Sequence, residues 1–310
     1  IMTNLKKLGL TALAGSLVAT TGYAGALDIS GAASVSYVSQ DETETTGNPF
    51  SMTRDITFSG SGEMDNGMTI SYHQMLTAGA FSSSGLKLDM GDAGTLTFGN
   101  GTSQGSGIGA YEDKMPTAKE QVWDDLDGQA NGLVAISSAN TIGYQTSVAG
   151  ANFSVNYNAD GGTTTADSSK SFAVDYAPVD GAMVFLAMGD ISGGTNAAAD
   201  HATYGGTYTM GATTVGIQMT SLDKSAANTD EDRTHIAASF AVNEDLSVSW
   251  GMSTVEFESA AKTDQEDSGF SVSYTMGSMT LSAAANQSDN VSGTSGTDDT
   301  HKEVNLAFAF

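Results

Sequence analysis

Acidic side chains gather in one segment of the sequence, between residues 101 and 140. Carboxylates concentrated in this way create a negative potential that attracts cations and repels anions. The segment is about forty residues long and opens with Gly105, Gly107 and Gly109, and a connection of that length is usually functional. The chemistry that we expect here is therefore electrostatic. The acids are Glu112, Asp113, Glu120, Asp124, Asp125 and Asp127, against Lys114 and Lys119.

Two interpretations of this segment stay open. It is either a solvated surface loop or a loop that folds into the interior of a larger structure and narrows it. Residues 116–126 are predicted to form a short helix, because Thr117 and Glu120 have the spacing of a capping box. The choice between the two interpretations depends on whether the rest of the chain encloses a space.

Motifs for covalent chemistry are weak. The chain has no Cys, which excludes disulfides, thiolate catalysis and Cys-based metal centres. Residues 101–105 match the G-x-S-x-G element of hydrolases and residues 105–110 match a loose dinucleotide fingerprint, but neither lies in the strand–turn–helix context that these motifs need. The histidines show no metal-ligand spacing. We expect no catalytic residue, no cofactor and no enzymatic activity.

Short acidic clusters elsewhere raise the question of calcium. Calcium prefers several carboxylate oxygens, so Asp230, Asp232, Asp298 and Asp299 are weak candidates for a structural site. None of them follows the spacing of an EF-hand. Solvated loop charge is the favoured interpretation of these aspartates.

The charge balance limits the possible partners. The chain has 310 residues and a formal net charge of −25, which excludes nucleic acid because phosphate backbones need a basic surface. Charged residues make up 15% of the chain, against about 25% in typical soluble domains. Apolar residues are scattered singly between Ser, Thr, Gly and Asn, which does not fit an ordinary soluble core.

Residues 1–26 have the pattern of a secretory signal peptide. Lys6 and Lys7 precede an apolar stretch from Leu8 to Ala19, and small residues follow up to Ala26. The apolar stretch is too short to cross a bilayer. We assign residues 1–26 to a signal peptide and residues 27–310 to a single β-barrel domain, for the following reasons.

After residue 26 the sequence alternates between apolar and small polar residues, which is the period of an extended strand. Sixteen such runs are present, and about 18 residues per strand and connection suit a transmembrane strand of about 10 residues. Short turns rich in Gly, Asn and Asp alternate with long polar loops at 39–50, 159–169, 190–201, 222–233, 256–267 and 286–301. This asymmetry predicts an all-β, up-and-down antiparallel barrel.

The environment of the apolar face decides the class of protein. In the C-terminal run, Val304, Leu306 and Phe308 share one face while Glu303 and Asn305 share the other. A secreted β-sandwich would bury such a face in its core, so alternation alone leaves that class open. Aromatic residues near the strand ends favour the interfacial girdles of a transmembrane barrel.

The chain resembles the sixteen-stranded trimeric general porins of alphaproteobacteria. The resemblance rests on the opening strand Leu27 to Gly31, on Glu63-x-Asp65-x-Gly67 turning into the next strand, and on the strand end 97–100 that leads into the long segment. It also rests on the terminal Phe310. It implies an outer-membrane barrel of a Gram-negative bacterium, with a long third loop folded inward.

The resemblance further implies a constriction between acids of the third loop and bases on the facing wall. The bases are mostly missing here. Lys87 and His73 have lumen parity and are candidate constriction residues, as is Asp55, whereas Arg54 has the parity of the outward face. We therefore expect a cation-favouring pore for passive diffusion of small hydrophilic solutes and ions. The resemblance also implies that the barrel is embedded in outer-membrane lipids as a homotrimer. Arg233 and His235 share an inward parity near a loop.

Two other classes stay open. A secreted or cell-surface β-rich adhesin or structural protein would share the signal peptide, the acidity and the strand pattern. It would be released without detergent. An outer-membrane hydrolase barrel would need a Ser–His–acid set at its rim.

Overall fold

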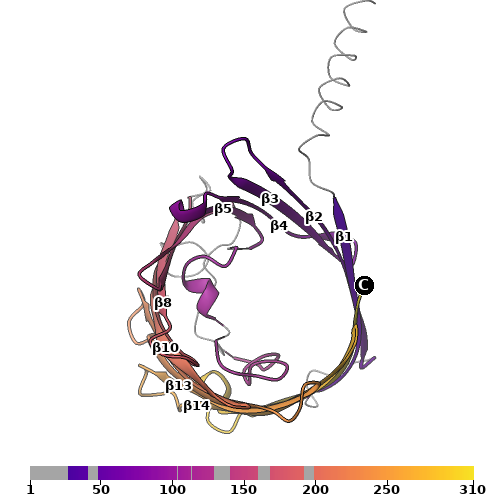
Figure 1. The fold of residues 1–310 in the computed structure, drawn as a ribbon. Helices are drawn as coiled ribbons and strands as arrows, with labels where there is room; N and C mark the ends of the chain where they lie inside the picture. Colours follow the sequence, from indigo (N-terminus) through magenta and orange to yellow (C-terminus); the bar gives the residue numbers. More distant parts are fainter. Residues whose placement is uncertain are drawn as a thin grey trace, which may run out of the picture.

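A closed β-barrel makes up the protein (Figure 1). The computed structural model describes residues 27–40, 48–102, 104–112, 114–128, 140–159, 168–191 and 199–310; the expected signal peptide lies outside them. The strands are β1 Asp28–Gln40, β2 Phe50–Glu63, β3 Thr69–Thr77, β4 Ala80–Asp89, β5 Thr95–Asn100, β6 Thr141–Val148, β7 Ala151–Asn158, β8 Ser169–Tyr176, β9 Ala182–Ile191, β10 Ala199–Met210, β11 Thr213–Lys224, β12 Glu231–Ala241, β13 Leu246–Phe257, β14 Gln265–Met276, β15 Met279–Asp289 and β16 Asp299–Ala309.

Each strand pairs antiparallel with its neighbours in the sequence, and β1 pairs with β16 to close the ring. The closure continues to the last residue, where the Gly31 amide donates to the Phe310 carbonyl at 2.7 Å and the Phe310 amide donates to the Gly31 carbonyl at 2.9 Å. A closed ring satisfies the backbone groups of every strand and leaves no edge. The expected sixteen-stranded up-and-down topology is confirmed.

The two faces of the wall are inverted relative to a soluble protein. Gln218 on β11 points inward and is fully buried, whereas its neighbour Ile217 points outward and is 42% exposed. On β16, Val304 and Phe308 point outward and are exposed, while His301 faces the interior and is buried. No second sheet covers the apolar face in the described part of the chain. The β-sandwich alternative is therefore wrong.

Turns and loops alternate along the ring as expected. One end carries tight turns, where Gly211 and Gly277 adopt the left-handed φ of +63° that favours glycine. At the other end the strands run further than the apolar pattern indicates, so the loop expected at 256–267 shrinks to the residues between Phe257 and Gln265. At this end of the barrel the strands carry polar residues on both faces, so they show no alternation between apolar and polar residues.

The long connection between β5 and β6, residues 101–140, is called the lumen loop from here on. Its described residues lie inside the barrel, as the second interpretation of this segment requires (Figure 1). Its regular structure within the described residues is a 3₁₀ helix, Ile108–Tyr111. The helix expected over 116–126 does not form. Thr117 Oγ1 accepts the Lys119 amide at 3.3 Å and donates to the Glu120 carbonyl, but the segment consists of bends and turns. None of the described helical segments has the length and hydropathy needed to cross a membrane.

Candidate functional site

The lumen loop follows the inner wall from β6 round to β16, and this course defines the candidate site. Figure 1 shows the loop nearer to β8, β10, β13 and β14 than to β1–β4. Polar side chains on the inward face of the wall hold it in place. The loop therefore occupies one side of the barrel interior and faces the opposite wall across the lumen.

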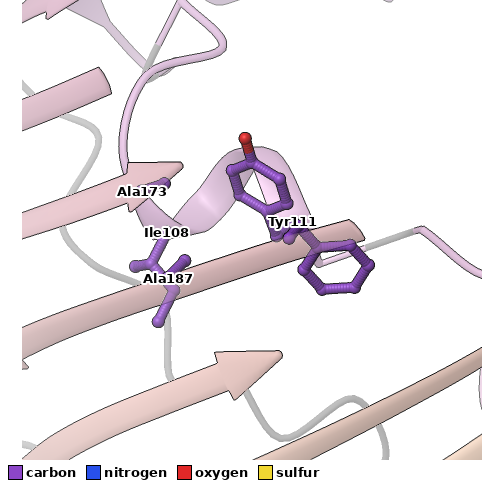
Figure 2. Close-up of a cluster of buried hydrophobic side chains, with 5 residues drawn as sticks. Ile108, Tyr111, Ala173 and Ala187 are labelled. Carbon is purple, nitrogen blue, oxygen red and sulfur yellow. The ribbon is translucent and has the colours of Figure 1, made fainter. Parts of the chain in front are cut away.

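The first anchor lies against β7, β8 and β9. The amides of Gly107 and Ile108 donate to Ser154 Oγ at 3.0 Å and to Ser171 Oγ at 2.9 Å. Ile108 packs with Ala173 and Ala187, small residues that leave room for it against the wall (Figure 2). These contacts fix the start of the loop by both hydrogen bonding and burial.

Tyr111 completes the first anchor. Its ring lies beside Phe185 with centroids 5.2 Å apart, and its hydroxyl donates to Asp175 Oδ2 at 2.6 Å. Burial, together with the hydrogen bond and the negative charge of Asp175, raises the pKa of the Tyr111 phenol above its ordinary range. The phenol is therefore a stable donor at neutral pH.

The second anchor joins the middle of the loop to β13 and β14. The Ala118 amide donates to Ser249 Oγ at 2.9 Å and the Lys119 amide donates to Ser271 Oγ at 3.1 Å. The two serine hydroxyls are themselves 2.7 Å apart. A strip of inward serines thus binds backbone groups that have no strand partner, which satisfies buried polar groups on both sides.

Wall glycines allow the loop to lie this close. A Cβ added to Gly216 on β11 would lie 2.7 Å from Pro116 Cδ, and one added to Gly251 on β13 would lie 2.9 Å from Val122 Cγ1. Real Cβ atoms do not approach other atoms so closely. Glycine is required at these positions because the loop packs directly on the backbone of the wall.

The third anchor is an ion-pair cluster between the loop and β16. Lys119 Nζ lies between the carboxylates of Glu120 and Glu303 and pairs with both. Burial alone would lower the pKa of Lys119, but its hydrogen bonds to the two glutamates outweigh burial and raise the pKa. Asn286 Nδ2 also donates to Glu120 Oε1 at 3.2 Å. Lys119 therefore stays charged and neutralises part of the acidic loop.

The acids predicted to line the constriction lie in different environments on the loop. Glu112 directly follows the 3₁₀ helix and is half-buried, and Glu120 belongs to the ion-pair cluster. Asp125 and Asp127 are exposed. The Asp124 carboxylate accepts a hydrogen bond from an amide of the loop itself at 2.8 Å. Asp113 lies outside the described residues.

The remaining predicted residues lie on the wall strands β2–β4. Register places Asp55, His73 and Lys87 on the inward face, and His73 and Lys87 line a cavity of about 320 Å³ together with Asp28. The structure thus separates them from the ion-pair cluster of the loop. Their part in a constriction stays a prediction.

The other predicted bases are accounted for on the wall. Arg233 is buried on the inward face of β12 and pairs with Glu231, which also pairs with Lys224. His235 is fully buried against the Trp123 ring. Arg54 is exposed on the outward face of β2, as its parity predicts. The interior therefore carries few cations that are not held by an acid.

The weak calcium candidates are not brought together as a ligand set. Among the described residues, the acids and histidines close enough to share a metal ion are Glu120, Asp125, His301 and Glu303, and this group contains none of the four candidate aspartates. The oxygens of Asp230 and Asp299 accept hydrogen bonds from the amides of Lys224 and Asp127. Calcium at these aspartates stays a prediction.

Sequence reasoning missed the wall residues that hold the loop. They are uncharged and common residue types with no motif, namely Ser154, Ser171, Gly216, Gln218, Ser249, Gly251, Ser271 and Asn286. Their inward parity was the available signal. Parity does not reveal which part of an inner wall a loop will cover.

Comparison with known proteins agrees with this architecture. Residues 9–310 match the family model described as Gram-negative porin. No curated protein sequence matches the chain.

Several solved structures share the fold at low sequence identity. The anion-selective porin from Comamonas acidovorans is 16% identical, with a TM-score of 0.71 over 92% of this chain and 100% of that chain. A loop-deletion variant of OmpT, an outer membrane protein of Vibrio cholerae, is 13% identical, with a TM-score of 0.72 over 92% of this chain and 99% of that chain. A variant of the Rh. blastica porin is 17% identical, with a TM-score of 0.63 over 92% and 100% of the two chains.

The expectation of a general porin is thereby confirmed, while the narrower alphaproteobacterial subgroup stays a prediction. The adhesin and hydrolase alternatives have no support from the family model or the fold. An interior lined by polar side chains and an exterior of exposed apolar ones fit a barrel that conducts water-soluble solutes through lipid. The chain belongs to the Gram-negative porin family and is an outer-membrane channel for passive diffusion.

Proposed function

We propose that this porin favours cations over anions. The observation that carries the proposal is the balance of charge inside the barrel. Asp125 and Asp127 are exposed on the lumen loop, whereas Lys119 and Arg233 are held by glutamates. Low-dielectric walls focus the field of exposed charges on a permeating ion. Small hydrophilic solutes pass by diffusion, with no cofactor and no covalent step.

The fold by itself does not decide the sign of the selectivity. The Comamonas acidovorans porin is anion-selective and has the same fold. The preference of each barrel must therefore come from the side chains that line its lumen. In this chain, Lys87 and His73 are the lumen-facing bases on the wall of β3 and β4, and the exposed acids of the loop oppose them.

The test is the reversal potential of the purified protein in a planar bilayer under a salt gradient. The wild type should show a cation-selective potential. The double variant Asp125→Asn and Asp127→Asn should shift it toward the anion side, because it removes two exposed charges at unchanged size. Asp180→Asn, on a turn between strands, is the matched control and should leave the potential unchanged. An anion-selective wild type would contradict the proposal and leave the fold untouched.

We also propose that the chain assembles as a homotrimer. Arg54 supports this, because it is exposed on the outward face of β2 between Met52 and Ile56. An Arg facing hydrocarbon costs about 2–4 kcal/mol near the bilayer midplane, so a protein neighbour is a better environment for it. Native mass spectrometry in detergent should give trimers, and Arg54→Glu should weaken them. Monomers alone would refute the trimer without affecting the pore.

A further inference from the structure

Four potential metal ligands converge where the lumen loop meets β16. Glu120 and Asp125 come from the loop, and His301 and Glu303 come from the inward face of β16. One ligand atom from each lies within 4.8 Å of the ligand atoms of the other three. Two separate parts of the chain thus present oxygen and nitrogen donors to one point.

His301 gives an independent indication that this point is a binding site. The residue is 3% exposed, and neither ring nitrogen has a hydrogen-bond partner among the described residues. Buried polar groups are nearly always hydrogen-bonded, so such an imidazole needs an explanation. Its Nε2 lies 3.7 Å from Asp125 Oδ2, which is too far for a hydrogen bond. The imidazole therefore faces the Asp125 carboxylate at ion-pair distance but makes no hydrogen bond to it.

A positive charge already occupies part of the cluster. Lys119 Nζ pairs with Glu120 and Glu303, and it stands where a cation shared by the two carboxylates would lie. The ammonium is bound to the two glutamates and makes no hydrogen bond to either ring nitrogen of His301. Asp125 and His301 thus remain available to a cation that accepts oxygen and nitrogen donors together.

The donor set selects the kind of cation. Calcium and magnesium take oxygen ligands, whereas zinc, copper and nickel combine imidazole with carboxylates. Zinc takes four ligands of this kind in a tetrahedral arrangement. We propose that Glu120, Asp125, His301 and Glu303 form a binding site for a divalent transition-metal ion such as zinc, and that binding displaces the ammonium of Lys119 from between the glutamates.

Occupation of the site has two consequences. The metal ion links residues 120–125 of the lumen loop to β16 and so holds this part of the loop against the wall. It also places a divalent charge beside the exposed acids, which lowers the attraction for permeating cations. The second consequence rests on the proposed cation preference, but the binding itself does not.

Binding is tested directly on the full-length protein in detergent, by isothermal titration with zinc chloride. The wild type should bind one ion per chain. His301→Asn and, separately, Asp125→Asn should each weaken binding by more than about tenfold, since even outer-shell partners of metal ligands are typically worth that much. His73→Asn is the matched control, because this histidine also faces the lumen but lies outside the cluster. It should bind as the wild type does.

A variant of Lys119 distinguishes a specific metal site from non-specific binding of zinc to an acidic surface. Lys119→Met should tighten zinc binding, because the competing ammonium is gone, and calcium should not replace zinc in any variant. Equal affinity in the wild type, His301→Asn and Asp125→Asn, or weaker binding in Lys119→Met, would overturn the site. In a planar bilayer, zinc should reduce cation current in the wild type and not in His301→Asn. Binding without an effect on current would refute only the proposed charge effect.

Discussion

Trp123 of the lumen loop stacks against His235 of β12, with ring centroids 4.2 Å apart and an angle of 44° between the planes. Both residues are nearly fully buried. Trp123 also belongs to a buried hydrophobic cluster with Met115 and Val122 of the loop and Ala237 of β12. The stack therefore anchors the acidic part of the loop to the wall.

Removal of this anchor should release the loop without opening the barrel. A buried Trp→Ala change costs about 3–5 kcal/mol in a core, and the cost here falls on loop docking because the strands do not depend on Trp123. Trypsin should then cleave Trp123→Ala after Lys114 or Lys119, and should not cleave the wild type at these two sites. Trp250→Ala removes the outward-facing tryptophan and is the control. Cleavage in neither variant would show that the other anchors suffice.

The close approach at Gly216 predicts a second effect on the loop. A Cβ there meets Pro116 Cδ at 2.7 Å and Met115 Cε at 3.1 Å, so Gly216→Ala should push the loop toward the centre of the lumen. We expect a lower single-channel conductance and a loss of about 1–3 kcal/mol from overpacking. Val215→Ala, on the outward face of the same strand, should conduct as the wild type does. An unchanged conductance in Gly216→Ala would contradict direct packing on the wall.

The raised pKa of Tyr111 predicts how stability changes at alkaline pH. Its neutral phenol is favoured in the folded protein, so its contribution is complete below the ordinary tyrosine pKa of 10.0 and is lost as the pH rises through the higher folded-state pKa. The thermal stability of the wild type should therefore fall more steeply above pH 10 than that of Tyr111→Phe. Parallel curves for the two proteins would show that the hydrogen bond to Asp175 has no such effect.

The contrast between the two faces of one strand tests the membrane orientation. Ile236→Lys places a charge on the exposed apolar face of β12 and should cost about 2–4 kcal/mol of folding free energy in lipid vesicles if it lies near the midplane. Ser239→Lys, on the inward face of the same strand, should cost much less because water fills the lumen. Equal costs would mean that the apolar face does not meet lipid.

The strands could be predicted from the sequence because each one obeys a local rule. Runs such as Val304 to Phe310 alternate strictly, since one side meets lipid and the other meets the lumen. The rule fails at the loop ends of β14 and β15, where residues on the outward face, such as Glu266 and Gln287, are polar as well. There the environment depends on the loops, and a local pattern cannot report it.

The acidity of the lumen loop could also be predicted, but its conformation could not. The capping-box spacing of Thr117 and Glu120 favours a helix locally, yet Ser249 and Ser271 bind the backbone of this segment in a course of bends and turns. Tertiary hydrogen bonds from strands more than one hundred residues away override the local preference. Asp125 and His301 are also far apart in the sequence, so their proximity could not be predicted from a local pattern.

The reciprocal hydrogen bonds between Gly31 and Phe310 have a consequence for how the protein is made. Phe310 extends the seam between β1 and β16, so the ring cannot close until this part of the chain has reached the membrane. A chain that lacked β16 would expose two unpaired strand edges, and each edge could pair with another copy of the chain. During assembly, the unpaired edges of β1 and β15 must therefore be kept from other chains until β16 is in place. Deletion of a few residues next to Phe310 should destabilise the barrel far more than an equal deletion in a surface loop.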